Sequence, residues 1–339
     1  MRKFRILSID GGGLRGVVPL TILKKVEELT KRRITETFDL IAGTSTGGLI
    51  TCALSLQNPL NIGHPLYNID DIMDVYLKRG SEIFPDRGFL ANSIHKFKDL
   101  TSPKYDTIGI EKVFKSILKD YRLTDVLNNI VVSSYDLTNN APLFFKSRIG
   151  KANNEQNALL YDICRATSAG PTYLPSYQFY YPSENENPNR NCIDGGVFVN
   201  NPSLAALSEF SKYFKDYLPD TTEDDIDYNN VFVLSLGTGS YTDQICEADS
   251  ENKGELFWAM HISDIMMRGV NRANDYAMKE MMIEGNYLRL SIAIDSESHS
   301  EMDNSSEETT KYLIEATKDQ IVNNKTNIDN LTALLYKMK

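Results

Sequence analysis

A serine on a glycine-flanked turn is the residue of this chain best placed for chemistry. Residues 38–42 form an apolar run that predicts a strand, Gly43, Ser45 and Gly47 form a Gly-x-Ser-x-Gly turn, and residues 49–56 continue with helical spacing. This strand–turn–helix setting is typical of a nucleophile elbow, in which the glycines admit a strained backbone and the serine hydroxyl stands exposed. The alternative interpretation is an ordinary tight turn between a strand and a helix.

A second glycine-rich turn precedes the serine by one predicted strand and one predicted helix. Residues 4–10 predict a buried strand, residues 11–16 read Gly-Gly-Gly-Leu-Arg-Gly, and a helix is predicted over residues 17–34. The glycine spacing matches a dinucleotide-binding loop, but that loop needs an acidic residue at the end of the next strand. Here the next strand ends at the serine turn instead, and the Lys-Ser/Thr pair of a P-loop is missing.

The backbone of Gly11, Gly12 and Gly13 is therefore predicted to form an oxyanion hole. Consecutive glycines expose their N–H groups without side chains in the way, and the N-terminus of a helix adds partial positive charge. In this interpretation Arg15 adds further positive charge near the developing oxyanion. A solvated or structural arginine is the alternative at that position.

The second candidate catalytic residue is an aspartate far along the chain. A short apolar strand ends at Asp194, and Gly195 and Gly196 let the backbone turn tightly beside another segment. An Asp-Gly pair commonly caps a turn, which is the alternative interpretation. As a catalytic base, Asp194 would accept the proton of Ser45.

A triad with histidine is supported only by the order of residues in the chain. Only His261, in a helix predicted over residues 255–283, and His299, in a loop rich in serine and glutamate, follow Asp194. A Ser45–Asp194–His261 triad therefore stays open beside a Ser45–Asp194 dyad. A dyad asks more of the aspartate, because a free carboxylate with a pKa of ~3.9 is a weak base for a serine. Burial beside the serine would raise that pKa.

Composition and charge exclude several classes of protein. The 339 residues are 41% hydrophobic and 24% charged, with a net charge of −10. No region concentrates lysine and arginine, so we expect no nucleic-acid partner. We expect neither a signal peptide nor a membrane-spanning helix. The four cysteines lack metal-ligand spacing, which predicts free thiols, a cytoplasmic protein, and neither a metal nor another cofactor.

Residues 58–106 are rich in proline and glycine and predict no simple β–α unit. Within them, residues 76–104 hold six basic and three acidic side chains together with several aromatic and aliphatic ones. A basic, aromatic segment near an esterase site suggests a mobile lid or a membrane-touching flap. A plain insertion that covers the core is the alternative.

Three of these motifs, in this order, resemble those of the patatin-like phospholipase family. The motifs stand at residues 10–16, 43–48 and 194–196, and weaker matches stand at residues 161–164, 234–239 and 301–303. The similarity covers nearly all of the chain. It implies a single domain over residues 1–339, with the catalytic motifs within residues 10–196 and closing C-terminal helices at residues 307–339.

The resemblance implies an α/β fold, a three-layer α/β/α sandwich with a central, mostly parallel mixed sheet. It also implies a Ser45–Asp194 dyad without histidine, with the Gly11–Gly13 backbone and Arg15 as the oxyanion hole. The expected substrate is a membrane phospholipid or galactolipid, reached by peripheral contact with the membrane. Two alternatives stay open: a non-catalytic lipid- or nucleotide-binding module, and a bacterial effector hydrolase that a cyclic nucleotide activates at a second site not located in the sequence.

Overall fold

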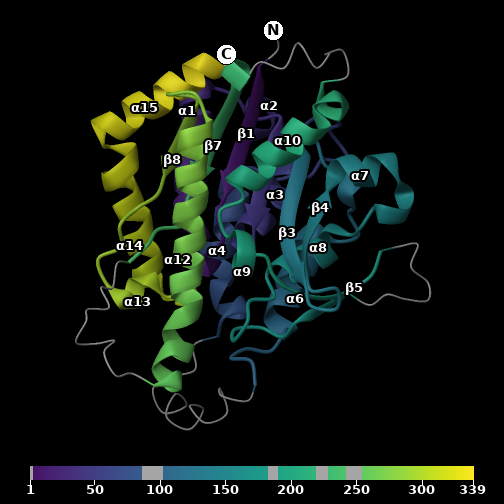
Figure 1. Ribbon diagram of the computed structural model, residues 1–339, viewed down its shortest axis with the longest axis vertical. Coiled ribbons are helices and arrows are strands. Elements are labelled where there is room, and N and C mark those ends of the chain that lie inside the picture. The colour runs from purple at the N-terminus through teal and green to yellow at the C-terminus, as the bar shows by residue number, and fades with distance from the viewer. Residues whose placement is uncertain (1–2, 86–101, 182–189, 219–227, 242–253) are drawn as a thin grey trace.

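The structure is a computed structural model, shown in Figure 1. It describes residues 3–85, 102–181, 190–218, 228–241 and 254–339, apart from the side chains of residues 228 and 255–264. Residues 86–101, which make up most of the predicted lid segment, lie outside the described residues.

A mixed sheet of eight strands runs through the centre of the molecule. The parallel strands are β1 (Phe4–Ile9), β2 (Leu40–Thr44), β3 (Asn129–Asp136), β7 (Val231–Leu236) and β8 (Tyr287–Leu290). The others are β4 (Ala141–Lys146), β5 (Tyr177–Phe179) and β6 (Arg190–Asp194), and β4 and β6 run antiparallel to β3. The order is β5-β6-β3-β2-β1-β7-β8, with β4 paired to β3. The prediction of a mostly parallel mixed sheet is confirmed.

The central strands are buried on both faces, which explains their unbroken apolar sequences. In β1, Leu7 and Ile9 belong to the hydrophobic cluster on one face, whereas Phe4 and Ile6 belong to the cluster on the other. Successive side chains of a strand point to opposite faces, so a strand between two layers of helices needs apolar residues at nearly every position.

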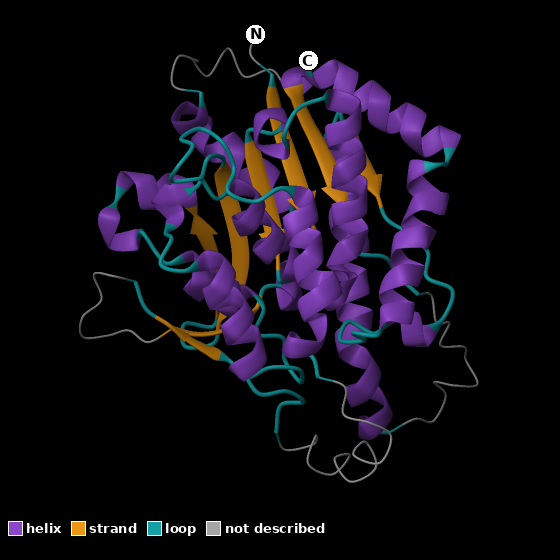
Figure 2. Cartoon of the chain, turned by 180° about the vertical axis from the view of Figure 1, so that it is seen from behind, coloured by secondary structure: helices purple, strands orange, loops and turns teal. Residues whose placement is uncertain are grey.

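Helices cover both faces of the sheet, as Figures 1 and 2 show from opposite sides, and this confirms the three-layer sandwich. One face carries α1 (Val17–Thr30), α3 (Thr46–Ser55), α4 (Ile69–Ile83), α6 (Ile108–Leu118), α8 (Leu160–Thr167), α14 (Glu307–Thr317) and α15 (Lys325–Met338). The other carries α10 (Ser203–Tyr217) and α12 (Glu255–Met281). Shorter helices are α2 (Ile34–Thr37), α7 (Ser147–Ala152), α9 (Gly196–Val199) and α13 (Glu297–Ser300).

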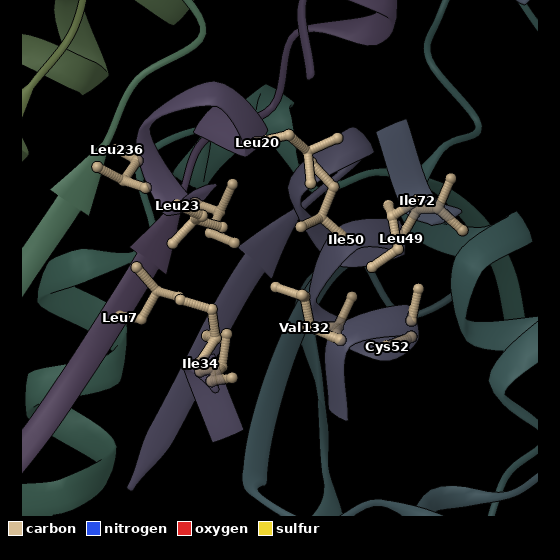
Figure 3. Packing of buried hydrophobic residues seen from close by; sticks show 14 of the residues in the cluster. Leu7, Leu20, Leu23, Ile34, Leu49, Ile50, Cys52, Ile72, Val132 and Leu236 are labelled. Carbon is tan, nitrogen blue, oxygen red and sulfur yellow. The ribbon is translucent and has the colours of Figure 1, made fainter. Parts of the chain in front are cut away.

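The larger hydrophobic cluster fixes α3, the helix that follows the candidate nucleophile. Figure 3 shows Leu20 and Leu23 of α1 and Ile50 of α3 gathered over Leu7 and Val132 of the sheet. Each of these five side chains is fully buried. The middle of α3 is therefore held against the sheet by apolar packing.

The helix predicted over residues 17–34 is interrupted, so that prediction is wrong in its second half. The helix α1 ends at Thr30, because Lys31 adopts a left-handed conformation with φ of 57°. The carboxylate of Glu27 then accepts the N–H of Ile34 at 3.0 Å, which satisfies the first residue of α2. A helix end usually places glycine in the left-handed position, so the lysine gave no signal in the sequence.

The helix α4 was missed in the proline- and glycine-rich segment. Asn68 caps it by accepting the N–H of Asp71 at 2.9 Å, and the carboxylate of Asp71 in turn accepts the N–H of Asn68. This reciprocal pair is a capping box, and an Asn-x-x-Asp signal before periodic apolar residues was available in the sequence. The first part of the predicted lid, Tyr76 to Ile83, is thus helical, and Tyr76 and Ile83 are buried.

The structure bears on the predicted free thiols and the predicted lack of a membrane-spanning helix for the described residues only. Cys52, Cys164 and Cys192 are buried free thiols, as predicted, and Cys246 lies outside the described residues. Within the described part of the chain, none of the helices combines the length and the apolar composition needed to cross a bilayer.

Candidate active site

Ser45 lies on the sharp turn between β2 and α3, as the elbow prediction requires. Its backbone has φ of 54° and ψ of −121°, a conformation that residues other than glycine rarely adopt. Its N–H donates to Oγ1 of Thr167 at 2.8 Å, and its carbonyl accepts the N–H of Leu49 at 3.1 Å. The side chain is partly exposed. The turn is held in its strained form while the hydroxyl stays accessible.

Close contacts explain the two glycines that flank this serine. A Cβ on Gly47 would lie 2.2 Å from the carbonyl oxygen of Ile9, and one on Gly43 would lie 2.1 Å from the carbonyl oxygen of Gly47. These neighbours are backbone atoms, which cannot move aside as a side chain can. Only glycine fits at either position, and the elbow therefore packs directly against the end of β1.

The strands that lead to the two candidate catalytic residues, β2 and β6, end opposite neighbouring residues of β3. Thr44, the last residue of β2, pairs with Ser133, and Asp194, the last residue of β6, pairs with the next residue, Ser134. The strand β4 pairs with the same part of β3 and so occupies its other edge. The strands β2 and β6 therefore run toward each other along one edge, which brings the serine beside the aspartate.

Asp194 lies near enough to Ser45 for the serine hydroxyl to favour the charged form of the carboxylate and so to lower its pKa. Asp194 also accepts the N–H of Gly196 at 2.7 Å, and its own N–H donates to the carbonyl of Ala169 at 3.0 Å. A Cβ on Gly195 would lie 2.3 Å from Oγ of Ser133, so this glycine permits the close approach to β3. The two glycines after the aspartate thus orient its carboxylate toward the serine.

The environment of Asp194 makes it a stronger base than a free carboxylate. Burial raises the pKa of Asp194 to about 6, while the hydrogen bonds from Ser45 and from the N–H of Gly196 act in the opposite direction. Desolvation penalises the charged form of a carboxylate, and a pKa nearer to neutrality improves a general base at physiological pH. The carboxylate is half-buried at the surface of the site.

The first glycine of the glycine loop, residues 11–13, has its N–H engaged within the protein. The N–H of Gly11 donates to the carbonyl of Asn200 at 3.2 Å. The carbonyl of Gly11 accepts two hydrogen bonds, from Oγ1 of Thr238 at 2.8 Å and from Nδ2 of Asn200 at 3.4 Å. Gly11 therefore fixes the loop, and its N–H is already bonded to Asn200, while the oxyanion hole itself stays a prediction.

The N–H groups of Gly12 and Gly13 have no acceptor among the residues that the structure describes. The carbonyl of Gly12 accepts the N–H of Arg15 at 3.2 Å and its Nε at 3.3 Å. In a planar trans peptide the C=O and N–H groups point in opposite directions. Because the carbonyls of Gly11 and Gly12 are held by the protein, the N–H groups of the same two peptides point the other way.

Arg15 supports the loop through its carbonyl groups. Besides the bonds to Gly12, its Nη1 donates to the carbonyl of Gly239 at 3.3 Å, just beyond β7. The side chain thus lies on the carbonyl side of the loop. Its contribution of positive charge to an oxyanion hole stays a prediction.

The candidate histidines are placed differently. His299 hydrogen-bonds Asp295 through Nδ1 at 3.0 Å and stacks on the ring of Tyr312. It is therefore engaged with residues of its own segment. His261 belongs to α12, but its side chain lies outside the described residues, so the triad with His261 stays a prediction.

Several supporting residues were missed by sequence reasoning. Thr167 donates from Oγ1 to the carbonyl of Ser133 at 2.6 Å while it accepts the N–H of Ser45. Thr44 contacts Oγ of Ser133 at 2.7 Å and the carbonyl of Val199 at 2.7 Å. Thr238 follows a strand that the sequence did predict, but nothing in the sequence links its hydroxyl to the glycine loop. Such hydroxyl contacts depend on the meeting of distant segments and carry no local signal.

Comparisons with known proteins agree with this geometry. The family model "Patatin-like phospholipase" matches residues 7–207, which include the elbow, the glycine loop and Asp194. Patatin-like protein 2 of Oryza sativa is 36% identical over 76% of this chain and 66% of its own length. Patatin-like protein 2 of Arabidopsis thaliana is 36% identical over 84% and 74%, and Patatin-T5 of Solanum tuberosum is 30% identical over 93% and 82%.

A similarity to a solved structure is much weaker. The crystal structure of VipD from Legionella pneumophila aligns with 94% of this chain and 67% of its own, at 9% identity and a TM-score of 0.42, too low to carry an argument. The family model, by contrast, spans the elbow, the glycine loop and Asp194, and together with the plant relatives it supports a lipid acyl hydrolase. On this evidence, the chain belongs to the patatin-like phospholipase family.

Proposed function

We propose that this protein hydrolyses fatty-acyl esters of membrane lipids, as a phospholipase A or lysophospholipase, through a Ser45–Asp194 dyad. The observation that carries the proposal is that a strained, accessible serine lies near a half-buried aspartate whose pKa its hydroxyl lowers. A nucleophile and a base within hydrogen-bond reach are the minimal requirement for covalent acyl transfer. In this proposal the glycine loop, which approaches Ser45 at Gly11, supplies two N–H groups.

The reaction then proceeds in two steps. Ser45 Oγ attacks the ester carbonyl carbon, its proton passes to Asp194, and the N–H groups of Gly12 and Gly13 bind the oxyanion. The protonated aspartate gives the proton to the leaving alcohol, which leaves an acyl-enzyme. Asp194 next takes a proton from a water molecule that attacks the acyl group, and the fatty acid is released with the serine regenerated.

The test of the dyad compares three variants. Ser45→Ala should lower kcat/KM on a phospholipid by at least about 1,000-fold, and Asp194→Asn should do nearly the same, because the two residues act as a unit. A fluorophosphonate probe should label the wild type and fail to label Ser45→Ala. The control is Ser208→Ala, an exposed serine on α10. Unlabelled, well-folded wild-type protein would favour the non-catalytic lipid- or nucleotide-binding module instead.

A separate variant distinguishes the dyad from the triad. His261→Ala should keep most of the activity if Asp194 is the base. Loss of activity comparable to that of Ser45→Ala, with an unchanged circular dichroism spectrum, would instead assign the base to the histidine.

Substrate access and regulation form the finer part of the proposal. A membrane phospholipid or galactolipid requires peripheral contact with a bilayer, and co-sedimentation of the Ser45→Ala variant with phospholipid vesicles tests that contact. Activation by a cyclic nucleotide stays a prediction from the resemblance. Its test is lipid hydrolysis with and without added cyclic nucleotides, together with the oligomeric size in each condition.

A further inference from the structure

A row of buried polar side chains crosses the sheet near the carboxyl ends of β1, β7 and β8, which Figure 1 shows side by side. Phe4 and Ile6 of β1 belong to a hydrophobic cluster, but the next residue on the same face, Ser8, is polar. Ser8 pairs in register with Ser235 of β7, and Ser235 pairs with Arg289 of β8. Residues in register share a face of the sheet, so these three polar side chains lie next to one another.

This row ends in a buried ion pair between Arg289 and Asp10, the residue that follows β1. Nη1 and Nη2 of Arg289 donate to the two carboxylate oxygens of Asp10 at 3.2 and 2.5 Å, and Nη1 also donates to Oγ of Ser235 at 2.7 Å. Asp10 is 2% exposed and the side chain of Arg289 is 16% exposed. Removing one partner of a buried pair leaves an uncompensated charge, so each residue depends on the other.

Asp10 stands at the base of the glycine loop. Its N–H donates to the carbonyl of Leu236 at 2.9 Å, and Gly11 follows it directly. In the proposed reaction the oxyanion is bound by the N–H groups of Gly12 and Gly13, which lie two and three residues further along. Charges interact more strongly where water is excluded, so an unpaired carboxylate at this base would oppose the developing negative charge.

Several described residues other than Arg289 also face Asp10. The charged and titratable ones that line the cavity beside it are Arg15, Tyr241, Arg268, Arg272, Asp275 and Arg289. Burial raises the pKa of Asp10, and Arg289 opposes this rise more strongly than Arg15 does. Asp275 of α12 acts in the same direction as burial. Within the described part of the chain, Arg289 therefore compensates most of the charge of Asp10.

We propose that Arg289 is a positioning residue for the glycine loop, which cancels the charge of Asp10 and holds it at the base of the loop. The inference rests on the proposed function, because a reaction that places an oxyanion on Gly12 and Gly13 is sensitive to that charge. Arg289 lies beyond residues 7–207, so the match to the family model gives it no role. A structural role alone predicts a less stable protein with an unchanged rate per folded molecule.

The first experiment removes the charge of Arg289. Arg289→Gln should lower kcat/KM on a phospholipid about 100-fold at about pH 8, an effect as large as the loss of an oxyanion-hole donor. The matched control is Arg148→Gln, because Arg148 pairs with buried Glu209 and its side chain is also 16% exposed. Both variants should unfold at lower urea concentrations, but only Arg289→Gln should lose activity per folded molecule. Equal kcat/KM in the two variants would overturn the proposal.

A second comparison tests whether the charge is the cause. Asp10→Asn combined with Arg289→Gln replaces the ion pair by two neutral amides, and kcat/KM should return to within about tenfold of wild type. Arg289→Lys keeps the charge and should also stay within about tenfold. This variant decides the question if Arg289→Gln does not fold. A folded double variant or Arg289→Lys that is about 100-fold slower than wild type would contradict the role in charge cancellation.

The pH dependence provides a readout that a loss of stability does not change. Protonation of Asp10 removes its charge, and its pKa rises further once Arg289 is gone, because the pairing with Arg289 lowers it. The ratio of kcat/KM in wild type to that in Arg289→Gln should therefore fall as pH falls. Both proteins keep Asp194, so its own titration cancels in the ratio. A constant ratio between about pH 5 and about pH 8 would refute the proposal.

The same measurements separate this inference from the proposed function. A well-folded wild type without esterase activity would contradict the proposed function and, with it, the role of Arg289. An active wild type whose rate Arg289→Gln leaves unchanged would contradict the role of Arg289 alone.

Discussion

The glycine loop is held on two sides, and the two sides work in different ways. On one side lies the serine elbow, where short motifs bring backbone atoms into direct contact. On the other side lies a pair of residues that we call the anchor, Met302 and Asp303. The carbonyl of Met302 accepts the N–H of Leu14 at 2.8 Å and lies where a side chain on Gly13 would be. The anchor therefore sets the position of the loop from outside the motifs.

The anchor reaches further than the elbow. Asp303 pairs with Nζ of Lys104 at 2.5 Å and accepts the hydroxyl of Tyr105 at 2.8 Å. The backbone N–H groups of Lys104 and Tyr105 donate to the carbonyls of Thr172 and Tyr173. A chain of polar contacts thus runs from the glycine loop to the turn between α8 and β5.

That turn contacts the candidate base. The carbonyl of Ala169 accepts the N–H of Asp194, and a Cβ on Gly170 would lie 3.7 Å from the carboxylate. The anchor therefore connects the glycine loop with Asp194 around the outside of the site. At the elbow, close backbone contacts leave no room for an added side-chain atom. The anchor instead acts through hydrogen bonds and an ion pair, which can be removed one at a time.

The largest effect is expected where one methyl group is added to the elbow. Gly47→Ala places a Cβ against the carbonyl oxygen of Ile9, and overpacking against backbone should cost about 3 kcal/mol or more of unfolding free energy. Activity should fall to background, measured as kcat/KM beside chemical denaturation. Gly269→Ala, on α12 with open space around it, should be neutral or stabilising by up to about 1 kcal/mol. A tolerated Gly47→Ala would contradict the steric account.

The second prediction uses the raised pKa of Asp194. Because the folded pKa is about 6 and the unfolded one is lower, the folded state binds more protons between these values, and stability falls as pH rises through this window. Asp194→Asn should therefore be about 1–3 kcal/mol more stable than wild type at pH 8, with the gain lost below about pH 4. Thermal unfolding across pH measures it. A gain that does not change with pH would contradict the assignment.

The activity of the wild type provides a check on the same group. The acid limb of kcat/KM should have an apparent pKa near 6, with activity rising toward higher pH as Asp194 loses its proton. A limb near the pKa of a free aspartate would show that the carboxylate is solvated during the reaction, and would weaken the dyad.

The comparison also explains what the sequence was able to predict. Ser45, Asp194 and the glycines stand in short motifs whose glycines are needed for local steric reasons, and both catalytic strands are apolar runs that end at those motifs. The resemblance implied a mostly parallel mixed sheet, but it predicted neither the strand order nor the meeting of β2 and β6 on β3. Short sequence motifs were therefore enough to predict the serine elbow and Asp194.

The anchor side had no comparable signal. Residues 301–303 were noticed only as a match to plant patatins, without a role, and Lys104 only as part of a basic segment. Their contacts join segments about 200 residues apart, and one polar side chain on a loop resembles any other until the partner is known. The left-handed Lys31 carried no local signal, whereas α4 was missed although its Asn-x-x-Asp capping box stands in the sequence.

The third prediction weakens the anchor. Asp303→Asn keeps an oxygen for Tyr105 but removes the charge that pairs with Lys104, whose side chain is 38% exposed against 4% for Asp303. Unfolding free energy should fall by about 1–2 kcal/mol and kcat/KM by about tenfold, because the glycine loop and the aspartate lose a shared support. Asp74→Asn, which breaks an exposed pair with Lys78, should change stability by less than about 0.5 kcal/mol. Unchanged kcat/KM in Asp303→Asn would confine the anchor to a structural role.

The smallest effect is expected at a polar contact on the elbow itself. The hydroxyl of buried Tyr76 lies 2.5 Å from Oγ1 of Thr46, the residue after the nucleophile. Tyr76→Phe removes this hydrogen bond and leaves the packing of the ring, so stability should fall by about 1 kcal/mol and kcat/KM by less than about threefold. Tyr336→Phe, at an exposed tyrosine, is the matched control. A loss of activity as large as that of Asp303→Asn would show that the elbow also depends on a polar contact, and the contrast between a steric side and an electrostatic side would no longer hold.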